Sequence, residues 1–157
     1  MQVAVLSGDT LLLSTRHGLE SVFVDREFGD FLTRADYLDV GAGSQALLAW
    51  PADDEIRAVL DLLAPAFEER YPRITRHALE AEIGMARQRG YAMVLDVVVE
   101  QMGGIVVPIR SGDGKRVAAT SLAALSQRTS DRLPILVPAM IKAAAELSAP
   151  YVQRAAA

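Results

Sequence analysis

Residues 91–122 constrain the fold more than any other part of the chain, because they hold three short apolar runs in close succession. These runs are Tyr91–Glu100, Gly104–Arg110 and Arg116–Leu122. The Asp113-Gly114 pair between the last two suits a hairpin turn whose central residues have positive φ. Strands joined by so short a turn are antiparallel neighbours. This segment therefore predicts three antiparallel strands in one sheet.

A second hairpin is expected near the start of the chain. Thr10–Ser14 and Glu20–Asp25 are short apolar runs, and the connection Arg16-His17-Gly18 between them has the length of a turn. Met1–Leu6 alternates only weakly in polarity. The sequence leaves open whether that segment is a strand or the end of an incoming helix.

Three helices are expected between the two groups of strands. Ser44 can cap a short helix that runs to Trp50, and the acidic run 53–55 opens a second helix at its positive end. Thr75 is the expected N-cap of a third helix, and Gly90 is its expected stop.

Helical spacing returns over Asp131–Ala149, where Pro138 lacks a backbone donor and is expected to kink the helix. The order of elements is thus two strands, three helices, three strands and a helix. This order predicts an α+β domain in which helices pack on one antiparallel sheet. A length of 157 residues fits a single domain.

The composition excludes several classes of function. The chain has no cysteine, so it can form no disulfide, thiol nucleophile or thiolate metal site. A net charge of -4 argues against a nucleic-acid-binding surface. The longest uncharged stretch, Val40–Ala52, is too short to cross a bilayer, and Met1–Gly8 lacks the basic start of a signal peptide. We expect a cytoplasmic domain with no metal, no cofactor and no membrane partner.

The loop Gly41-Ala42-Gly43 precedes a predicted helix start. Its spacing does not match a phosphate-binding loop, which needs a lysine after the second glycine. A helix start with almost no side chains around it can present free N–H groups to a small anion such as a carboxylate. The alternative is that the glycines only let the loop turn tightly against the sheet.

Two strand positions pose similar questions. Asp96 interrupts an apolar run, where it either faces solvent or is a pocket group. Thr120 and Ser121 are adjacent in a strand, so they face opposite sides of the sheet, and the inward hydroxyl needs a partner. No pattern brings His17 or His77 to a serine.

Several motifs in order resemble the C-terminal effector-binding domain of IclR-type transcriptional regulators. Each motif is short, but together they span nearly the whole chain: Gly8-Asp9-Thr10, Val22 to Arg26, Val40 to Gly43, Arg89 to Ala92, Val107 to Arg110, and Val117 through Ser121 to Arg128.

The resemblance implies a GAF-like fold, a curved antiparallel sheet flanked by helices. It implies a ligand-sensing, oligomerising domain over residues 1–157, not an enzyme, working as a homodimer or homotetramer. The family's N-terminal DNA-binding helix-turn-helix is expected to be absent from this chain, so no direct nucleic-acid contact is expected.

The resemblance also implies a site. Family members hold small organic acids between the glycine-bearing loop and the concave face of the sheet, and the matching residues here are Gly41, Ala42 and Ser121. Gly43 is expected to serve the turn beside them. The segment before the loop often covers the pocket, so Phe31 and Leu32 are expected as apolar lining or, equally, as core or dimer contacts.

Two departures from the family pattern concern the ligand. The family usually places Asn or Asp directly after Gly-Tyr-Ala, whereas Met93-Val94-Leu95 precede Asp96 here. A second serine, common two residues after the position of Ser121, is Ala123. Both changes indicate a more apolar pocket and an aromatic or otherwise hydrophobic acid.

Two other functions stay open on the sequence. A hydrolase-like enzyme would use Ser121 or Ser14 with a histidine, and a histidine ring within hydrogen-bond reach of a serine in a pocket would favour it. An assembly module would keep the fold with a vestigial pocket.

Overall fold

A five-stranded antiparallel sheet lies at the centre of the computed structural model, which describes residues 3, 7–17, 20–27, 50–70, 75–96, 100–111 and 116–155. The sheet order is β2-β1-β5-β4-β3. The strands are β1 (Thr10–His17), β2 (Glu20–Glu27), β3 (Ala92–Leu95), β4 (Met102–Arg110) and β5 (Arg116–Leu125). The helices of the described part are α3 (Asp53–Arg70), α4 (Arg76–Arg89) and α5 (Ser126–Ala155).

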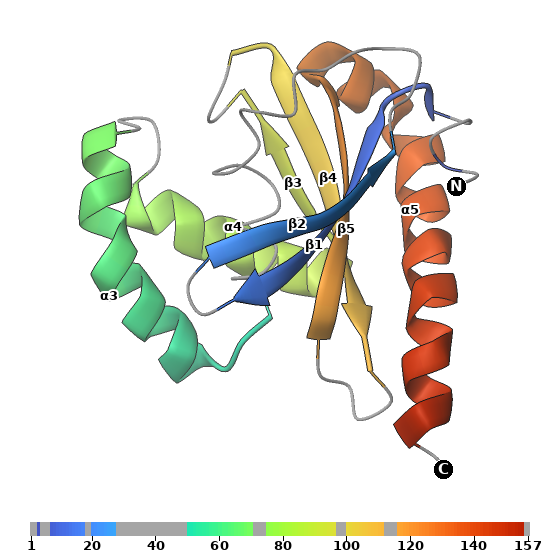
Figure 1. The fold of residues 1–157 in the computed structure, drawn as a ribbon. Helices are drawn as coiled ribbons and strands as arrows, with labels where there is room; N and C mark the ends of the chain where they lie inside the picture. Colours follow the sequence, from blue (N-terminus) through green and yellow to red (C-terminus); the bar gives the residue numbers. More distant parts are fainter. Residues whose placement is uncertain are drawn as a thin grey trace.

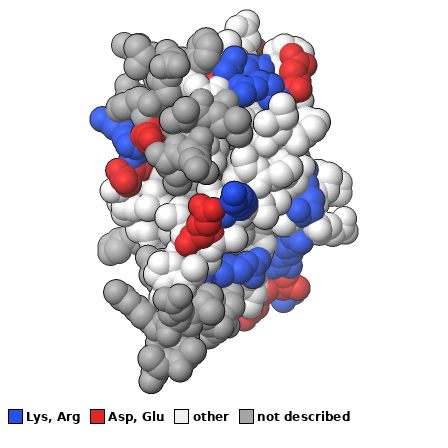
Figure 2. Space-filling view, turned by 90° about the vertical axis from the view of Figure 1, so that its right-hand side faces the viewer, with Lys and Arg blue, Asp and Glu red and all other residues white. Residues whose placement is uncertain are grey.

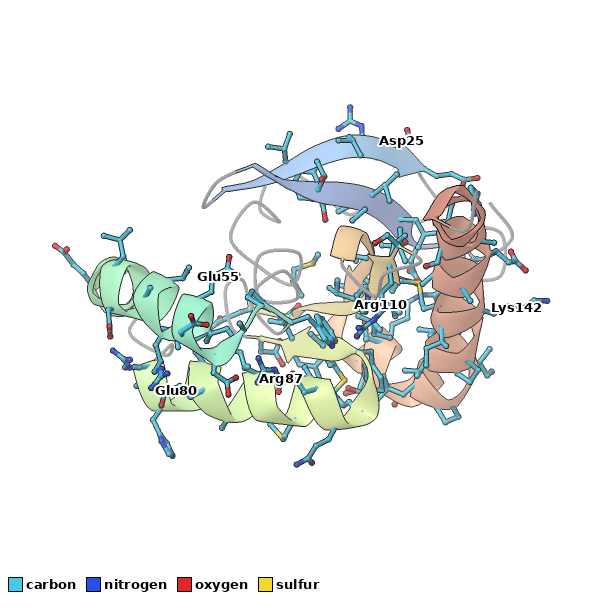
Figure 3. The ribbon with its side chains drawn as sticks, turned by 90° about the horizontal axis from the view of Figure 1, so that it is seen from below. Asp25, Glu55, Glu80, Arg87, Arg110 and Lys142 are labelled. Carbon is cyan, nitrogen blue, oxygen red and sulfur yellow. The ribbon has the colours of Figure 1, made fainter. Side chains whose placement is uncertain are left out.

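The two predicted strand groups form one sheet through the pairing of β1 with β5. In that pairing Leu12 lies opposite Ser121, although the β1–β2 hairpin and the β3–β4–β5 meander are far apart in the sequence. Seen from below, the strands turn from β3 beside α4 to β1 and β2 on the far side, so the sheet is strongly curved (Figure 3). The predicted α+β fold with a curved antiparallel sheet and flanking helices is confirmed.

Helices cover both faces of the sheet (Figure 1). Alternation along β4 sends Ile105, Val107 and Ile109 into a core with α5, where they meet Leu136 and Met140. The other face of the sheet forms a second core with α3 and α4. Its buried residues are Ile56, Leu60, Leu79, Ile83, Ala86, Ala92, Val94, Val106 and Ala119.

The ends of α4 are set by local hydrogen bonds, as the sequence predicts. The Thr75 hydroxyl accepts a bond from the Ala78 N–H at 3.2 Å, which makes Thr75 the N-cap. Gly90 has φ 83, and its N–H donates to the Ala86 carbonyl at 2.9 Å. A left-handed glycine at this position ends the helix.

Three expectations from the sequence need correction. The strand expected over Tyr91–Glu100 ends at Leu95, because Asp96 has φ 58 and turns the chain. Arg16 and His17 belong to β1 and not to the turn. The last helix begins at Ser126, before the expected start at residue 131.

Three other expected elements lie wholly or mostly outside the described residues. Residues 44–49 of the short helix expected from Ser44 to Trp50 lie outside the described residues, and Trp50 itself is not helical. The turn at residues 112–115 also lies outside the described residues. Of the first six residues only Val3 is described, and its backbone is helical, as is that of Ser7. At Val3, the described residue of this segment, the backbone agrees with the helical alternative.

The helix α5 contains three prolines, Pro134, Pro138 and Pro150. Its first turns run at an angle to the rest of the helix (Figure 1). Over Ser126–Pro150 it is long and apolar enough to cross a membrane by length and composition alone. Leu136 and Met140 on its inner side are fully buried in the core against the sheet.

Candidate functional site

Ser121 lies at the centre of the sheet, on the face turned away from α5. Its β5 neighbour Leu122 belongs to the core with α5, and Ala119 belongs to the core with α3 and α4. Alternation therefore places Ser121 on the same face as Ala119, and Thr120 on the opposite face. This answers the question that the adjacent hydroxyls pose in the sequence.

The side chain of Ser121 is 4% exposed, and its Oγ has no hydrogen-bond partner among the described residues. Buried hydroxyl groups in proteins are nearly always hydrogen-bonded to protein or to ordered water. The hydrogen-bond partner of the Ser121 hydroxyl is therefore expected outside the described residues, either in another part of the chain or in a bound molecule.

Two more hydroxyl groups lie on this face of β1. Thr10 is paired with Ala123, and Ser14 with Ala119, so both are diagonal neighbours of Ser121. Both side chains are buried, and the Ser14 hydroxyl donates to the Ala119 carbonyl at 3.5 Å.

The remaining register neighbours of Ser121 are apolar. Leu12 lies opposite it on β1 and Val106 on β4, and both are buried. Ala119 and Ala123 flank it along β5 with small side chains. This surface offers neutral hydrogen bonds within an apolar setting, which is the usual make-up of a small-molecule site.

The predicted loop contacts cannot be compared with this geometry. Gly41, Ala42, Gly43, Phe31 and Leu32 lie outside the described residues. Their place beside Ser121 stays a prediction.

Asp96 lies in the turn after β3 and is exposed. Its Oδ1 accepts bonds from the Gln101 N–H and the Ser126 hydroxyl, each at 2.7 Å. The Ser126 N–H in turn donates to the Gln101 carbonyl at 2.8 Å. The carboxylate therefore joins the β3–β4 turn to the first residue of α5, and the structure does not bring it together with Ser121.

A buried ion pair that no sequence motif indicated lies at the start of β1. The Asp9 carboxylate, 1% exposed, accepts a bond from Arg128 Nε at 2.9 Å, and Arg132 Nη1 lies 3.8 Å from its other oxygen. Both arginines also donate to the Ser7 carbonyl. Their i, i+4 spacing on a helix was the available signal, but only tertiary structure shows that the partner is Asp9.

This ion pair is linked to the candidate site through the chain itself. Thr10 directly follows Asp9, and its side chain faces the same side as Ser121. At the start of β1, Asp9 is therefore bound by α5, and the next residue, Thr10, lies on the face of the candidate site.

The histidines give no support to serine chemistry in the described part of the chain. His77 is exposed on α4. His17 lies at the end of β1, and the acceptor of the Ser14 hydroxyl is the Ala119 carbonyl.

Comparison with known proteins agrees with this architecture. The family model described as "Bacterial transcriptional regulator IclR C-terminal" matches residues 1–149. The HTH-type transcriptional regulator XynR of Escherichia coli (strain K12) is 25% identical over an alignment of 133 residues that covers 80% of this chain and 52% of the relative. The chain thus spans about half the length of that relative.

Solved structures share the fold at low sequence identity. The C-terminal domain of the E. coli transcriptional regulator KdgR has a TM-score of 0.77 at 24% identity, over 94% of this chain and 90% of that chain. A putative transcriptional regulator from Rhodococcus sp. RHA1 has a TM-score of 0.82 at 23% identity, over 97% and 66% respectively. With the family match over residues 1–149, the chain belongs to the IclR family of bacterial transcriptional regulators, as a C-terminal effector domain.

Proposed function

We propose that this domain senses a small organic acid with an aromatic or otherwise apolar body on the sheet face that carries Ser121. The observation that carries the proposal is the buried Ser121 hydroxyl without a partner among the described residues. Ala119 and Ala123 on either side of it have small side chains, which is compatible with close approach of a ligand to the strand.

The chemistry of the face supports a ligand that is mostly apolar with one polar end. A serine hydroxyl can donate one hydrogen bond to a carboxylate oxygen. The charge would be held by main-chain N–H groups of Gly41, Ala42 and Gly43 at a helix start. Phe31 and Leu32 would enclose the apolar body, and the proposal leaves Asp96 out of the site.

In a regulator, such binding must favour one arrangement of the protein over another. A ligand shifts an equilibrium only by its difference in affinity for the two states. We propose a cytoplasmic homodimer or homotetramer in which the acid changes the position of the Ser7–Thr10 segment. The Asp9–Arg128 ion pair supports this, because Thr10 lies on the ligand face while Asp9 is held by α5. DNA would be bound by the N-terminal part of the full-length regulator.

The direct test is a thermal-shift measurement with benzoate, phenylacetate, butyrate and glycolate at millimolar concentration. Benzamide is the matched neutral control for benzoate. We expect the midpoint of unfolding to rise with at least one aromatic acid and not with benzamide, because a ligand that binds only the folded state stabilises it. Folded protein that no acid stabilises would overturn the proposal.

The role of Ser121 is tested by Ser121→Ala. Loss of one hydrogen bond to a charged carboxylate costs about 1.5–3 kcal/mol, so the Kd for the acid should rise about tenfold to a hundredfold in titration calorimetry. Thr120→Val removes the neighbouring hydroxyl on the opposite face and should leave the Kd unchanged. Equal effects of the two substitutions would show that Ser121 does not contact the ligand.

A further inference from the structure

The outer side of α5 carries an apolar stripe with no covering element among the described residues. The stripe consists of Pro134, Ile135, Pro138, Ile141 and Ala145, all exposed, and we call it the α5 outer face. Ile135 is 53% and Ile141 42% exposed. Steps of three and four residues place these side chains along one side of the helix.

Figure 2 looks onto this side of the molecule and shows a band of uncharged surface between groups of charged side chains. Single exposed apolar residues are common, but a continuous apolar band bordered by polar groups indicates a contact surface. The opposite side of α5 is already used, since Leu136, Met140 and Ala144 are buried against the sheet.

The two ends of the α5 outer face differ in charge. At its beginning, Asp131 is exposed and contributes a carboxylate. The carbonyl groups of Ser130 and Pro134 lack their usual helical donor, because Pro134 and Pro138 have no N–H. At its other end Lys142 is exposed and lies 4.0 Å from Glu146. Figure 3 shows Lys142 pointing away from the sheet.

We propose that the α5 outer face binds the same face of a second copy, with the two helices antiparallel about a two-fold axis at Pro138. In this arrangement Ile135 lies level with Ile141 of the second copy. Lys142 lies level with Pro134 of the second copy, and Asp131 is three residues further along, about 4.5 Å at the helical rise. The ammonium group can therefore reach both the carboxylate and the carbonyl groups that lack their usual helical donor.

Self-complementarity favours a second copy over a different partner. A two-fold contact uses the same surface of both copies. If one residue of the first copy contacts a second residue of the other copy, the reverse contact is also made. Ile135 and Ile141 lie at equal distances on either side of Pro138, and Lys142, which also lies beside Glu146, can face Asp131 of the second copy in both directions. A membrane surface would also accept the isoleucines, but it would not need this order of charges.

The inference rests on the oligomeric part of the proposed function and is independent of the acid site. It is tested by analytical ultracentrifugation of the whole chain and its variants, with circular dichroism to confirm folding. Ile135→Glu should abolish the dimer, since it buries a charge at the centre of the contact. Leu62→Glu, at a side chain 62% exposed on α3, is the matched control and should not change the mass.

Charge reversal tests whether the two helices meet in the antiparallel direction. Asp131→Lys and Lys142→Asp should each weaken dimerisation by about tenfold or more, because like charges then meet twice across the two-fold axis. The double variant D131K/K142D should recover most of the loss. Failure of the double variant to recover affinity would overturn the antiparallel arrangement.

Two further outcomes contradict the inference. One is a wild-type chain that stays monomeric at all concentrations while it binds phosphatidylglycerol vesicles in an Ile135-dependent manner, which would assign the stripe to a membrane. The other is a dimer that none of these substitutions affects. Acid binding measured on the same variants separates the two proposals, since a monomer stabilised by benzoate would leave the sensor function standing.

Discussion

At the scale of single residues, Gly103 shows how closely β4 approaches the start of α5. A Cβ atom at this position would lie 2.7 Å from Leu95 Cδ2, 3.2 Å from Ser126 Cα and 3.2 Å from Thr129 Oγ1. The leucine end could move, but the helix backbone cannot move without disturbing the contacts of Ser126. The glycine is therefore required for close packing.

We predict that Gly103→Ala lowers the free energy of unfolding by about 1–3 kcal/mol, the usual cost of overpacking a core. Urea denaturation measures this change. Gly84→Ala is the control, because a Cβ there has no neighbour within 4 Å. In the middle of α4 that change should stabilise the protein by up to about 1 kcal/mol, since alanine is the better helix former. A neutral Gly103→Ala would contradict the close packing.

The structure predicts a lowered pKa for Asp53, which lies in the first turn of α3. The hydrogen bond and the charge of Arg87 lower the pKa of its carboxyl group. A carboxyl group with a lowered pKa stabilises the folded state above its unfolded pKa. The stabilisation is lost as the pH falls through the folded pKa.

Arg87→Gln should therefore raise the pKa of Asp53 toward its ordinary value, as measured by NMR titration of the side-chain carboxyl carbon. High salt should raise it in the wild type as well, because both groups are solvent-exposed and screened. Arg57→Gln is the control. It removes the weakest of the contributions to the pKa of Asp53 and should cause the smaller change. An unchanged pKa in Arg87→Gln would show that the pair does not persist in solution.

At the scale of elements, α4 protects the edge strand β3. The Glu82 carboxylate accepts bonds from the Met93 N–H at 3.2 Å and from Arg89, while the Arg89 guanidinium lies 4.8 Å above the Tyr91 ring. An unpaired N–H on an edge strand invites pairing with another chain. The glutamate satisfies this donor from within the domain.

Glu82→Ala should therefore increase the rate of amide hydrogen exchange at Met93 and promote aggregation on heating. Exchange measured by NMR reports the first effect directly. Glu80→Ala on the same helix removes only an exposed ion pair with Arg76 and should leave Met93 unchanged. Equal exchange rates in both variants would contradict the role of Glu82.

Local sequence patterns predicted the ends of α4 correctly. Thr75 and Gly90 define α4 because a cap acts within four residues of itself. The sequence predicted a strand to Glu100, because the residues after Asp96 are apolar and continue the strand pattern. This prediction was wrong, since β3 ends at Leu95. Only the Asp96 bonds to Gln101 and Ser126 show that the chain turns there.

At the scale of the whole molecule, the Asp9 ion pair joins the two ends of the domain. Its carboxylate is buried and both arginines come from α5. Removing one partner of a buried pair leaves the other charge without its counterion.

Asp9→Asn should lower the free energy of unfolding by about 2 kcal/mol or more in urea denaturation. Asp54→Asn, at an exposed carboxyl group in the first turn of α3, should lower it by at most about 1 kcal/mol. Similar losses in the two variants would show that the Asp9 contact contributes no more than a surface charge.

The sequence by itself determined the types of the described strands and helices, the α+β class, the ends of α4 and the family resemblance, because each of these depends on short segments of the chain. Tertiary structure alone decided that β1 lies between β2 and β5, with Ser14 bonded to Ala119 across 105 residues of sequence. It also decided that Ser121 faces away from α5 and that Asp9 meets Arg128. Strand order and side-chain partners follow from the burial of both faces of the sheet, which is a property of the whole chain and of no local segment.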